Sequence, residues 1–248
     1  MNIRLLTFDV IDSTNTEALR QARMGADEGL CVVARQQTAG RGRQGRTWVS
    51  EKDAGLYFSM VLRPGIENKF FPLVTLMAGV AVRDTLAEIG IESDIKWVND
   101  IHVDEKKIAG ILAETTETDA GLAIVVGIGI NLRSTNTAGE LATSATSIES
   151  SIGRTIPHDE LVGELTRYLV YFYGILSGDS GPSAIIDEWR CRSSYFAGKP
   201  VRVVLEKGVE SGLTDGLEEN GALRVLRDDG SVAVIQAGDV HQLRPQRS

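Results

Sequence analysis

The amino-acid sequence predicts an α+β fold, in which helices pack against a mixed or antiparallel sheet and a small β domain follows. Over residues 1–197, segments with helical spacing of apolar side chains are interspersed with apolar runs of strand length. From residue 198 to residue 248, short β-like runs are separated by turn signals, at 218–221 (EENG) and 228–231 (DDGS). We therefore expect two domains with these bounds, the second a small β-barrel or sandwich packed on the first.

The first predicted helix spans residues 13–25. Thr14 and Glu17 have the spacing of a capping box, and Gly25 is placed to end the helix. Three later segments have helical periodicity or an amphipathic pattern. They are residues 71–90, 157–176 and 183–198.

Short apolar runs predict the strands. Asp104 and Glu105 stand between two such runs and suggest a hairpin, and Pro64 ends another run. The predicted strands of the first domain are residues 29–36, 55–63, 94–98, 100–103, 106–116 and 121–132.

Composition and charge indicate a cytoplasmic protein. No apolar run approaches the ~20 residues of a membrane span, and the N-terminus lacks a signal sequence. Cys31 and Cys191 show no pairing pattern, which is typical of a reducing compartment, and Cys31 lies in an apolar run as a packing residue. The net charge of −8 argues against broad binding of DNA or RNA.

Residues 37–48 (QTAGRGRQGRTW) combine glycine and arginine in an otherwise acidic chain. Gly40, Gly42 and Gly45 fit the pattern Gly-x-Gly-x-x-Gly, but no helical period follows, so a dinucleotide site is not indicated. Glycine lets backbone N–H groups turn toward one anion, and arginine offers a fixed fork for carboxylate or phosphate. We expect an anion-binding loop, with a solvated basic loop as the alternative. Trp48 either caps this loop or is buried for packing alone.

Polar groups also appear where other predicted elements begin or end. Ser13, Thr14 and Asn15 cluster at a helix start, and helix capping alone would explain one of them. Asn99 and Asp100 interrupt a strand-like run, where a plain turn is the alternative. The three histidines have no metal-ligand spacing, so we expect them to be structural or surface residues.

Two further stretches carry glycine beside a polar residue. Lys107 precedes the small pair Ala109–Gly110, and alternating glycines precede Asn131. Glycine inside a strand permits the close approach of another group, although tight packing would explain it equally well.

Taken in order, these stretches resemble the motifs of the biotin–protein ligase family, and the resemblance covers nearly the whole chain. The motifs are DSTN, QTAGRGRQGRTW, GLYFSMVL, KWVNDI, KKIAGILAE and VVGIGINL, and the C-terminal β segment resembles the SH3-like domain of the family. Val98 stands where the family usually has proline. Because the sequence starts directly at the catalytic motifs, the resemblance implies a monofunctional ligase without the DNA-binding winged helix of many bacterial relatives.

The resemblance implies a reaction in two steps. Biotin and ATP, with Mg²⁺, give biotinyl-5′-AMP and pyrophosphate, and the biotinyl group then passes to one lysine of the biotin carboxyl carrier domain of a carboxylase. Joining two anions requires cations and N–H donors rather than a protein nucleophile. Family members are often dimers, which leaves a homodimer open, and no Mg²⁺ ligands are named.

Site residues follow from the resemblance position by position. The expected catalytic residues are Arg43, Lys107 and Asp100, and it stays open whether Asp100 mainly binds the ureido ring or orients the acceptor lysine. The expected biotin-binding residues are Ser13, Thr14, Asn15, Gln37, Gly40, Arg41, Gly42, Arg43, Lys107 and Gly110. The expected ATP- or adenylate-binding residues are Arg41, Arg43, Arg46, Trp48, Lys107 and Asn131.

Two alternatives remain at this point. A lipoate– or octanoyl–protein ligase shares the core architecture but usually lacks paired GRGR and KWxND motifs. An RNA-binding module would use the Arg-Gly loop on single strands, but only Trp48 offers an aromatic ring near that loop.

Overall fold

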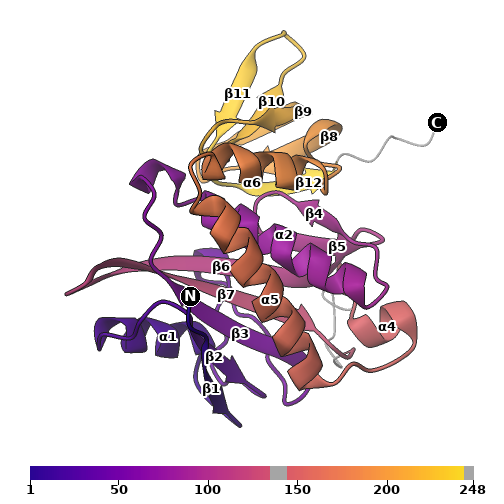
Figure 1. Ribbon diagram of the computed structural model, residues 1–248. Helices are drawn as coiled ribbons and strands as arrows, with labels where there is room; N and C mark the ends of the chain where they lie inside the picture. The colour runs from indigo at the N-terminus through magenta and orange to yellow at the C-terminus, as the bar shows by residue number, and fades with distance from the viewer. Residues whose placement is uncertain (135–143, 243–248) are drawn as a thin grey trace.

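The computed structural model describes residues 1–134 and 144–242, and its main feature is a seven-stranded sheet (Figure 1). The strands of this sheet are β1 (Arg4–Phe8), β2 (Leu30–Ala34), β3 (Gly55–Leu62), β4 (Asp94–Lys96), β5 (Asp100–Val103), β6 (Lys106–Thr118) and β7 (Gly121–Asn131). Their order is β1-β2-β3-β7-β6-β5-β4. β1 pairs with β2 in parallel, and the other neighbours are antiparallel, so of the two predicted types, mixed or antiparallel, this sheet is mixed.

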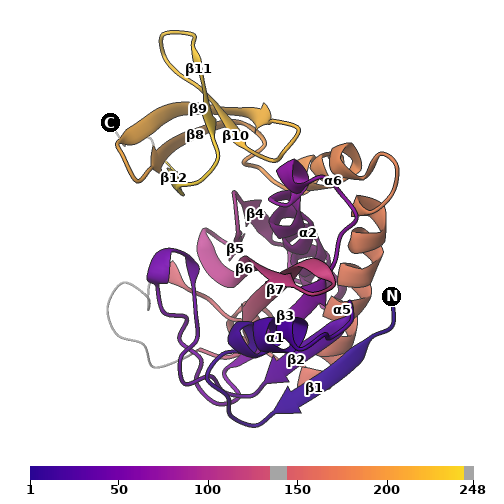
Figure 2. The same cartoon turned by 90° about the vertical axis from the view of Figure 1, so that its left-hand side faces the viewer.

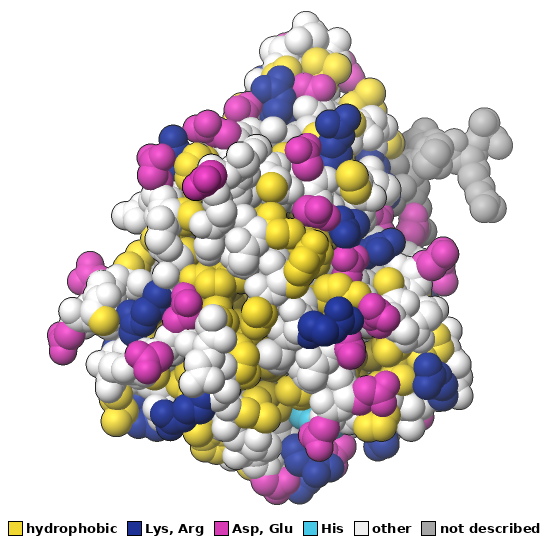
Figure 3. Space-filling model, in the orientation of Figure 1, with side chains coloured by type: hydrophobic (Ala, Val, Ile, Leu, Met, Phe, Trp, Pro, Cys, Tyr) yellow, Lys and Arg dark blue, Asp and Glu magenta, His cyan; other side chains and the backbone are white. Residues whose placement is uncertain are grey.

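Helices cover both faces of the sheet. They are α1 (Thr14–Arg23), α2 (Leu73–Glu88), α4 (Ile148–Ile152), α5 (His158–Leu176) and α6 (Gly181–Arg190), with 3₁₀ turns at Arg43–Gly45 and Asn68–Phe70. Among residues 1–134 and 144–242, no helix has the length and apolar character needed to cross a membrane. On the face that carries α5, basic and acidic side chains are interspersed (Figure 3). That face therefore offers no continuous basic surface to a polyanion.

The apolar run of β2 is buried throughout because both of its faces are covered. Cys31 and Val33 belong to the core that includes residues of α2 and α5, whereas Leu30 and Val32 pack with α1. Burial raises the pKa of the Cys31 thiol to about 12. The prediction that Cys31 is a packing residue is confirmed.

A second sheet lies at the β4 end of the first (Figures 1 and 2). Its strands are β8 (Ala197–Val204), β9 (Val209–Leu217), β10 (Leu223–Leu226), β11 (Val232–Ile235) and β12 (Asp239–Gln242), antiparallel in the order β11-β10-β9-β8-β12. Val201 and Val225 of this sheet belong to the same apolar core as α2. Trp97 Nε1 also donates a hydrogen bond of 3.0 Å to Gly221 O.

The structure corrects the predicted capping of the first helix. Ser13 is the N-cap, with its Oγ accepting from Thr16 N, so the capping-box prediction for Thr14 and Glu17 is wrong. Thr14 instead donates through its backbone N–H to Gln37 Oε1 over 2.8 Å.

The last predicted helix is also too long. It ends at Arg190, because Ser193 Oγ and Ser194 N donate to Ile95 O and Asp94 Oδ1 across the fold. β1 and α4 are elements that the sequence did not predict. Most side chains of β1 are exposed, so this edge strand has no clear alternating pattern.

Candidate active site

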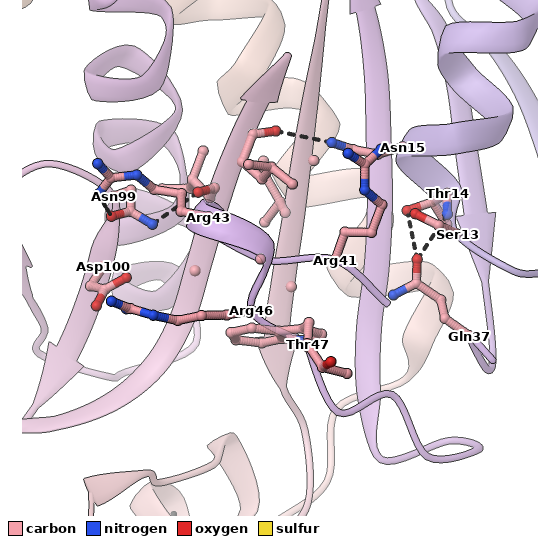
Figure 4. A pocket seen from close by; sticks show the side chains of 18 of the residues that line it. Ser13, Thr14, Asn15, Gln37, Arg41, Arg43, Arg46, Thr47, Asn99 and Asp100 are labelled. Carbon is pink, nitrogen blue, oxygen red and sulfur yellow. Dashed lines mark hydrogen bonds between the residues drawn. The ribbon is translucent and has the colours of Figure 1, made fainter. Parts of the chain in front are cut away.

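A cavity of about 330 Å³ opens between the start of α1, the loop of residues 37–48 and strands β5, β6 and β7. Its polar lining lies in two groups, one at the start of α1 and the other around the turn between β4 and β5 (Figure 4). The lining residues are Ser13, Thr14, Asn15, Gln37, Arg41, Gly42, Arg43, Arg46, Thr47, Trp48, Phe58, Asn99, Asp100, Lys107, Gly110, Ile111, Leu112, Gly127, Ile128, Gly129 and Asp239.

Glycines leave room on the sheet for a tryptophan ring. Gly110 and Gly129 are cross-strand partners on β6 and β7. A Cβ at Gly129 would lie 2.5 Å from the Trp48 ring, and a Cβ at Gly110 would lie 2.9 Å from it. The glycines are therefore needed for close approach, and Trp48 packs directly on the strands.

A bulge brings Lys107 to the face of the sheet that carries Asp100. Asp100 pairs with Gly110, but the register shifts after Ile101, so that His102 pairs with Lys107. A shift of one residue turns a strand side chain to the opposite face. Lys107 Nζ consequently lies 2.7 Å from Asp100 Oδ1, and 5.3 Å from the centroid of the Trp48 ring.

His102 borders this ion pair. Its Nε2 lies 4.0 Å from Asp100 Oδ2, and no hydrogen-bond partner for this buried atom is found among residues 1–134 and 144–242. Burial, together with the nearby charge of Lys96, lowers the pKa of His102 to about 4. The imidazole is therefore neutral around pH 7.

One end of the cavity is rich in neutral hydrogen-bonding groups. Gln37 Oε1 accepts from Thr14 N and Thr14 Oγ1, and Gln37 Nε2 donates to Ser50 Oγ over 2.8 Å. Ser59 Oγ lies 2.8 Å from Thr14 Oγ1 and 2.6 Å from Asn15 Oδ1. These mutual bonds fix the side chains before any ligand arrives.

Each arginine of the loop that lines the cavity is held by an acceptor on a different element. Arg41 donates to Glu114 Oε1 of β6 over 2.8 Å, and Arg46 pairs with Asp239 of β12. Arg43 donates to Asn99 Oδ1 over 2.8 Å. The acceptor of Arg43 is neutral, so its positive charge is not cancelled by this contact.

Asn99 is itself fixed. Its Nδ2 donates to Ile111 O over 3.0 Å, which turns Oδ1 toward Arg43. The cavity therefore has two electrostatically different ends. Ser13 to Asn15 with Gln37 form a neutral end, and Arg43 lies away from them (Figure 4). Arg43 and Lys107 form a cationic end.

Two of the residues expected in the site lie outside the cavity lining. Gly40 stands behind it, where its carbonyl accepts from Trp48 N and a Cβ would lie 2.3 Å from Trp48 O. Asn131, at the end of β7, donates to Thr146 O over 2.9 Å. The other expected site residues all line the cavity.

Sequence reasoning assigned no role to several residues that build the site. Asn99 was visible inside KWVND, beside Asp100, but its contact with Arg43 depends on the fold. Asp239 and Glu114 gave no local signal, because their arginine partners are distant in sequence.

The part of the chain that the structure describes has no ready-made cluster of metal ligands. Within residues 1–134 and 144–242, no three His, Cys, Asp or Glu side chains are grouped so that they could hold a metal ion. Asp100 and Asp239, the acidic side chains in the cavity lining, are paired with Lys107 and Arg46. We therefore assign no Mg²⁺ ligand and no step to the metal.

Comparison with known proteins supports the assignment of the chain to a family. Residues 7–131 match the model of the biotin/lipoate A/B protein ligase family. Over 160 residues the chain is 43% identical to the bifunctional ligase/repressor BirA of Bacillus spizizenii, an alignment that covers 63% of this chain. The chain thus spans about half the length, 49%, of that relative.

Two further proteins are similar over nearly their full length. The biotin--[acetyl-CoA-carboxylase] ligase of Paracoccus denitrificans is 32% identical over 237 residues, which is 92% of this chain and 96% of the relative. The solved structure of the Aquifex aeolicus biotin protein ligase in complex with biotin and ATP superposes with a TM-score of 0.83 at 29% identity. It covers 98% of this chain and 99% of that one. With the matched motifs brought together around one cavity, these similarities show that the chain belongs to the biotin/lipoate A/B protein ligase family.

Proposed function

We propose that this protein is an ATP-dependent biotin–protein ligase. The observation that carries the proposal is the division of the cavity into a neutral hydrogen-bonding end and a cationic end. Biotin has a neutral ureido ring at one end and a carboxylate at the other. A cavity of about 330 Å³ is of a size suited to a small ligand of this kind. The names of the similar proteins, which are biotin ligases, support the same substrate.

In the first step, an oxygen of the biotin carboxylate attacks the α-phosphorus of ATP. The bond from that phosphorus to the bridging oxygen breaks, and pyrophosphate leaves with the electron pair. Arg43 and Lys107 offset the charge of the two anions and stabilise the charge that develops between them. Arg46 leaves its ion pair with Asp239 and contacts the phosphates instead.

In the second step, a lysine amine of the carrier domain attacks the acyl carbon of biotinyl-5′-AMP. An amide bond forms as the bond from the acyl carbon to the phosphate oxygen breaks, AMP leaves with that electron pair, and the proton of the amine passes to solvent. Asp100 lies at the cationic end, 2.7 Å from Lys107 Nζ, and is suited to orient the incoming amine. The loop of residues 40–47 orders over the adenylate and excludes water, which protects the reactive anhydride.

The neutral end binds the ureido ring through Ser13, Thr14, Asn15 and Gln37, with the backbone of Arg41 in the lining and that of Gly40 behind it, next to Gln37. Arg41 is already paired with Glu114, so we assign it to the biotin end rather than to the phosphates. Gly110 allows the ligand to approach β6 closely.

The proposal extends to the nucleotide end of the cavity, the two domains and the partner of the enzyme. Trp48 packs beside the adenylate, and Asn131 turns from Thr146 O to the adenine edge. We assign residues 1–197 to the catalytic domain and residues 198–248 to an SH3-like domain. The five-stranded antiparallel sheet, whose first strand begins at Ala197, supports this division. We place the enzyme in the cytoplasm, with a biotin carboxyl carrier domain as its partner.

Biotin-dependent exchange of labelled pyrophosphate into ATP tests the proposal. We expect exchange with biotin, no exchange without it, and none with lipoate or octanoate. Labelled biotin should then become bound to a carrier domain in the presence of ATP. Exchange that requires lipoate or octanoate instead would identify a ligase for those acids, and exchange with none of the three would contradict the proposal.

A further inference from the structure

Glu114 of β6 connects the neutral end of the cavity to the loop of residues 37–48, although Glu114 does not line the cavity itself. Its Oε1 accepts from Arg41 over 2.8 Å, and its Oε2 accepts from Asn15 Nδ2 over 2.9 Å. The Glu114 side chain is 22% exposed, against 46% for Arg41. One carboxylate thus joins three separate elements, namely α1, β6 and the loop.

The contact to Asn15 determines which way its amide faces. Asn15 Nδ2 donates both to Glu114 and to Leu112 O, while Oδ1 is 2.6 Å from Ser59 Oγ. A flipped amide would set its oxygen against two acceptors and leave them unpaired. Ser59 in turn contacts Thr14, so the orientation of the Asn15 amide also affects the position of Thr14 at the neutral end.

The contact to Arg41 determines the charge at this end. Arg41 lines the cavity, and without Glu114 it would present an uncompensated cation beside Asn15 (Figure 4). A free guanidinium attracts carboxylates and offers no acceptor for a ureido N–H. Paired with Glu114, it leaves this end neutral in total.

We propose that Glu114 is a positioning residue that makes the Ser13–Asn15 end selective for a neutral cyclic urea over an anionic group. This proposal rests on the proposed function, because it concerns how the same cavity selects biotin. The expected discrimination is against ligands with a carboxylate at both ends.

The test compares wild type with Glu114→Gln, which keeps the size of the side chain but removes its charge. We expect the KM for biotin in pyrophosphate exchange to rise about tenfold, with the KM for ATP changed by less than about twofold. Because Arg41 is then unpaired, nonanedioate, a straight-chain dicarboxylate, should inhibit about fivefold more strongly. The double variant Arg41→Ala with Glu114→Gln should lose this added inhibition.

Glu117→Gln is the matched control, since Glu117 lies on the same strand and is exposed. It should leave both KM values and the inhibition unchanged, and thermal unfolding should establish that every variant is folded. Wild-type biotin KM and nonanedioate inhibition in Glu114→Gln would overturn the inference. A raised biotin KM with unchanged inhibition would also overturn it, because a merely structural role gives that result. Failure of biotin-dependent exchange in wild type would instead refute the proposed function.

Discussion

Lys107 Nζ lies 2.7 Å from Asp100 Oδ1 because a bulge between β5 and β6 places Lys107 opposite His102. In an unshifted ladder, continued from the Asp100–Gly110 pair, Lys107 would face the other side of the sheet. The ion pair at the cationic end therefore depends on one extra residue in β6.

We expect Lys107→Ala to lower the rate of biotin-dependent pyrophosphate exchange by about 10²–10³-fold, since it removes a charge that stabilises the transition state. The fold should persist, because Lys107 is partly exposed. Exchange kinetics and circular dichroism are the measurements. Lys106→Ala, which changes the exposed neighbouring lysine, is the control. Exchange at the wild-type rate in Lys107→Ala would refute the proposed role of this lysine.

We expect Asn99→Ala to lower the exchange rate about tenfold without removing any charge, because Arg43 loses the acceptor that orients it. The backbone bond from Ile111 N to Asn99 O remains, so the local strand should hold. Steady-state exchange should be compared with Asn68→Ala, an exposed asparagine outside the cavity. If Asn99→Ala and Asn68→Ala behave alike, Asn99 does not position Arg43.

We expect Gly129→Ala to displace Trp48, since the new Cβ would lie 2.5 Å from its ring. Overpacking of this kind costs about 1–3 kcal/mol of unfolding free energy. Tryptophan fluorescence should shift to longer wavelength, because Trp97 and Trp189 are buried elsewhere and keep their environment. Gly65→Ala, where a Cβ meets nothing within 4 Å, should leave the spectrum unchanged.

We expect acid to destabilise the protein partly through His102. Burial and the charge of Lys96 lower its pKa to about 4, Lys107 acts in the same direction, and Asp100 and Asp94 oppose the shift. The unfolded chain takes up this proton near pH 6.5, as an ordinary histidine does. Between these two pKa values the unfolded state binds more protons, so the free energy of unfolding falls as the pH falls from 6.5 to 4.

The contribution of His102 to this loss is about 3 kcal/mol. Denaturant unfolding at pH 7 and pH 4.5 should therefore show a smaller difference for His102→Gln than for wild type. Burial also lowers the pKa of His158, which adds to the loss in both proteins. An equal difference in the two proteins would contradict the assignment to His102.

We expect Gly163→Ala to raise the free energy of unfolding by about 0.5–1 kcal/mol, because Gly163 is interior to α5 and a Cβ there meets nothing within 4 Å. Thermal unfolding measures the gain, and pyrophosphate exchange should be unchanged. A lower midpoint would indicate a contact that this side of α5 makes in solution.

The sequence predicted the long, strongly patterned elements well and the weakly patterned ones poorly. α2, α5, β3 and β7 carry unbroken apolar periodicity or continuous apolar runs, which their buried positions require. β1 is an exposed edge strand, and its pairing with β2 depends on partners distant in the chain. The end of α6 was missed because hydrogen bonds from Ser193 and Ser194 to other elements compete with the helix.

The candidate site also has features that could be predicted from the sequence and features that could not. Motif residues such as Ser13, Arg43 and Lys107 line one cavity, as the family resemblance implied. Which face Lys107 occupies could not be predicted, since a bulge leaves no fixed sequence mark. Pairings such as Arg46 with Asp239 join positions that only folding brings together.

The apolar core that runs without interruption from α2 into the second sheet has a consequence for how the protein unfolds. Gly221 fits so closely that a Cβ there would lie 2.8 Å from Leu76. A fragment that ends before β8 would expose Leu76 and the indole of Trp97. The exposed apolar patch would make this fragment prone to self-association. Heat should therefore melt both sheets in a single cooperative step rather than release the C-terminal strands first.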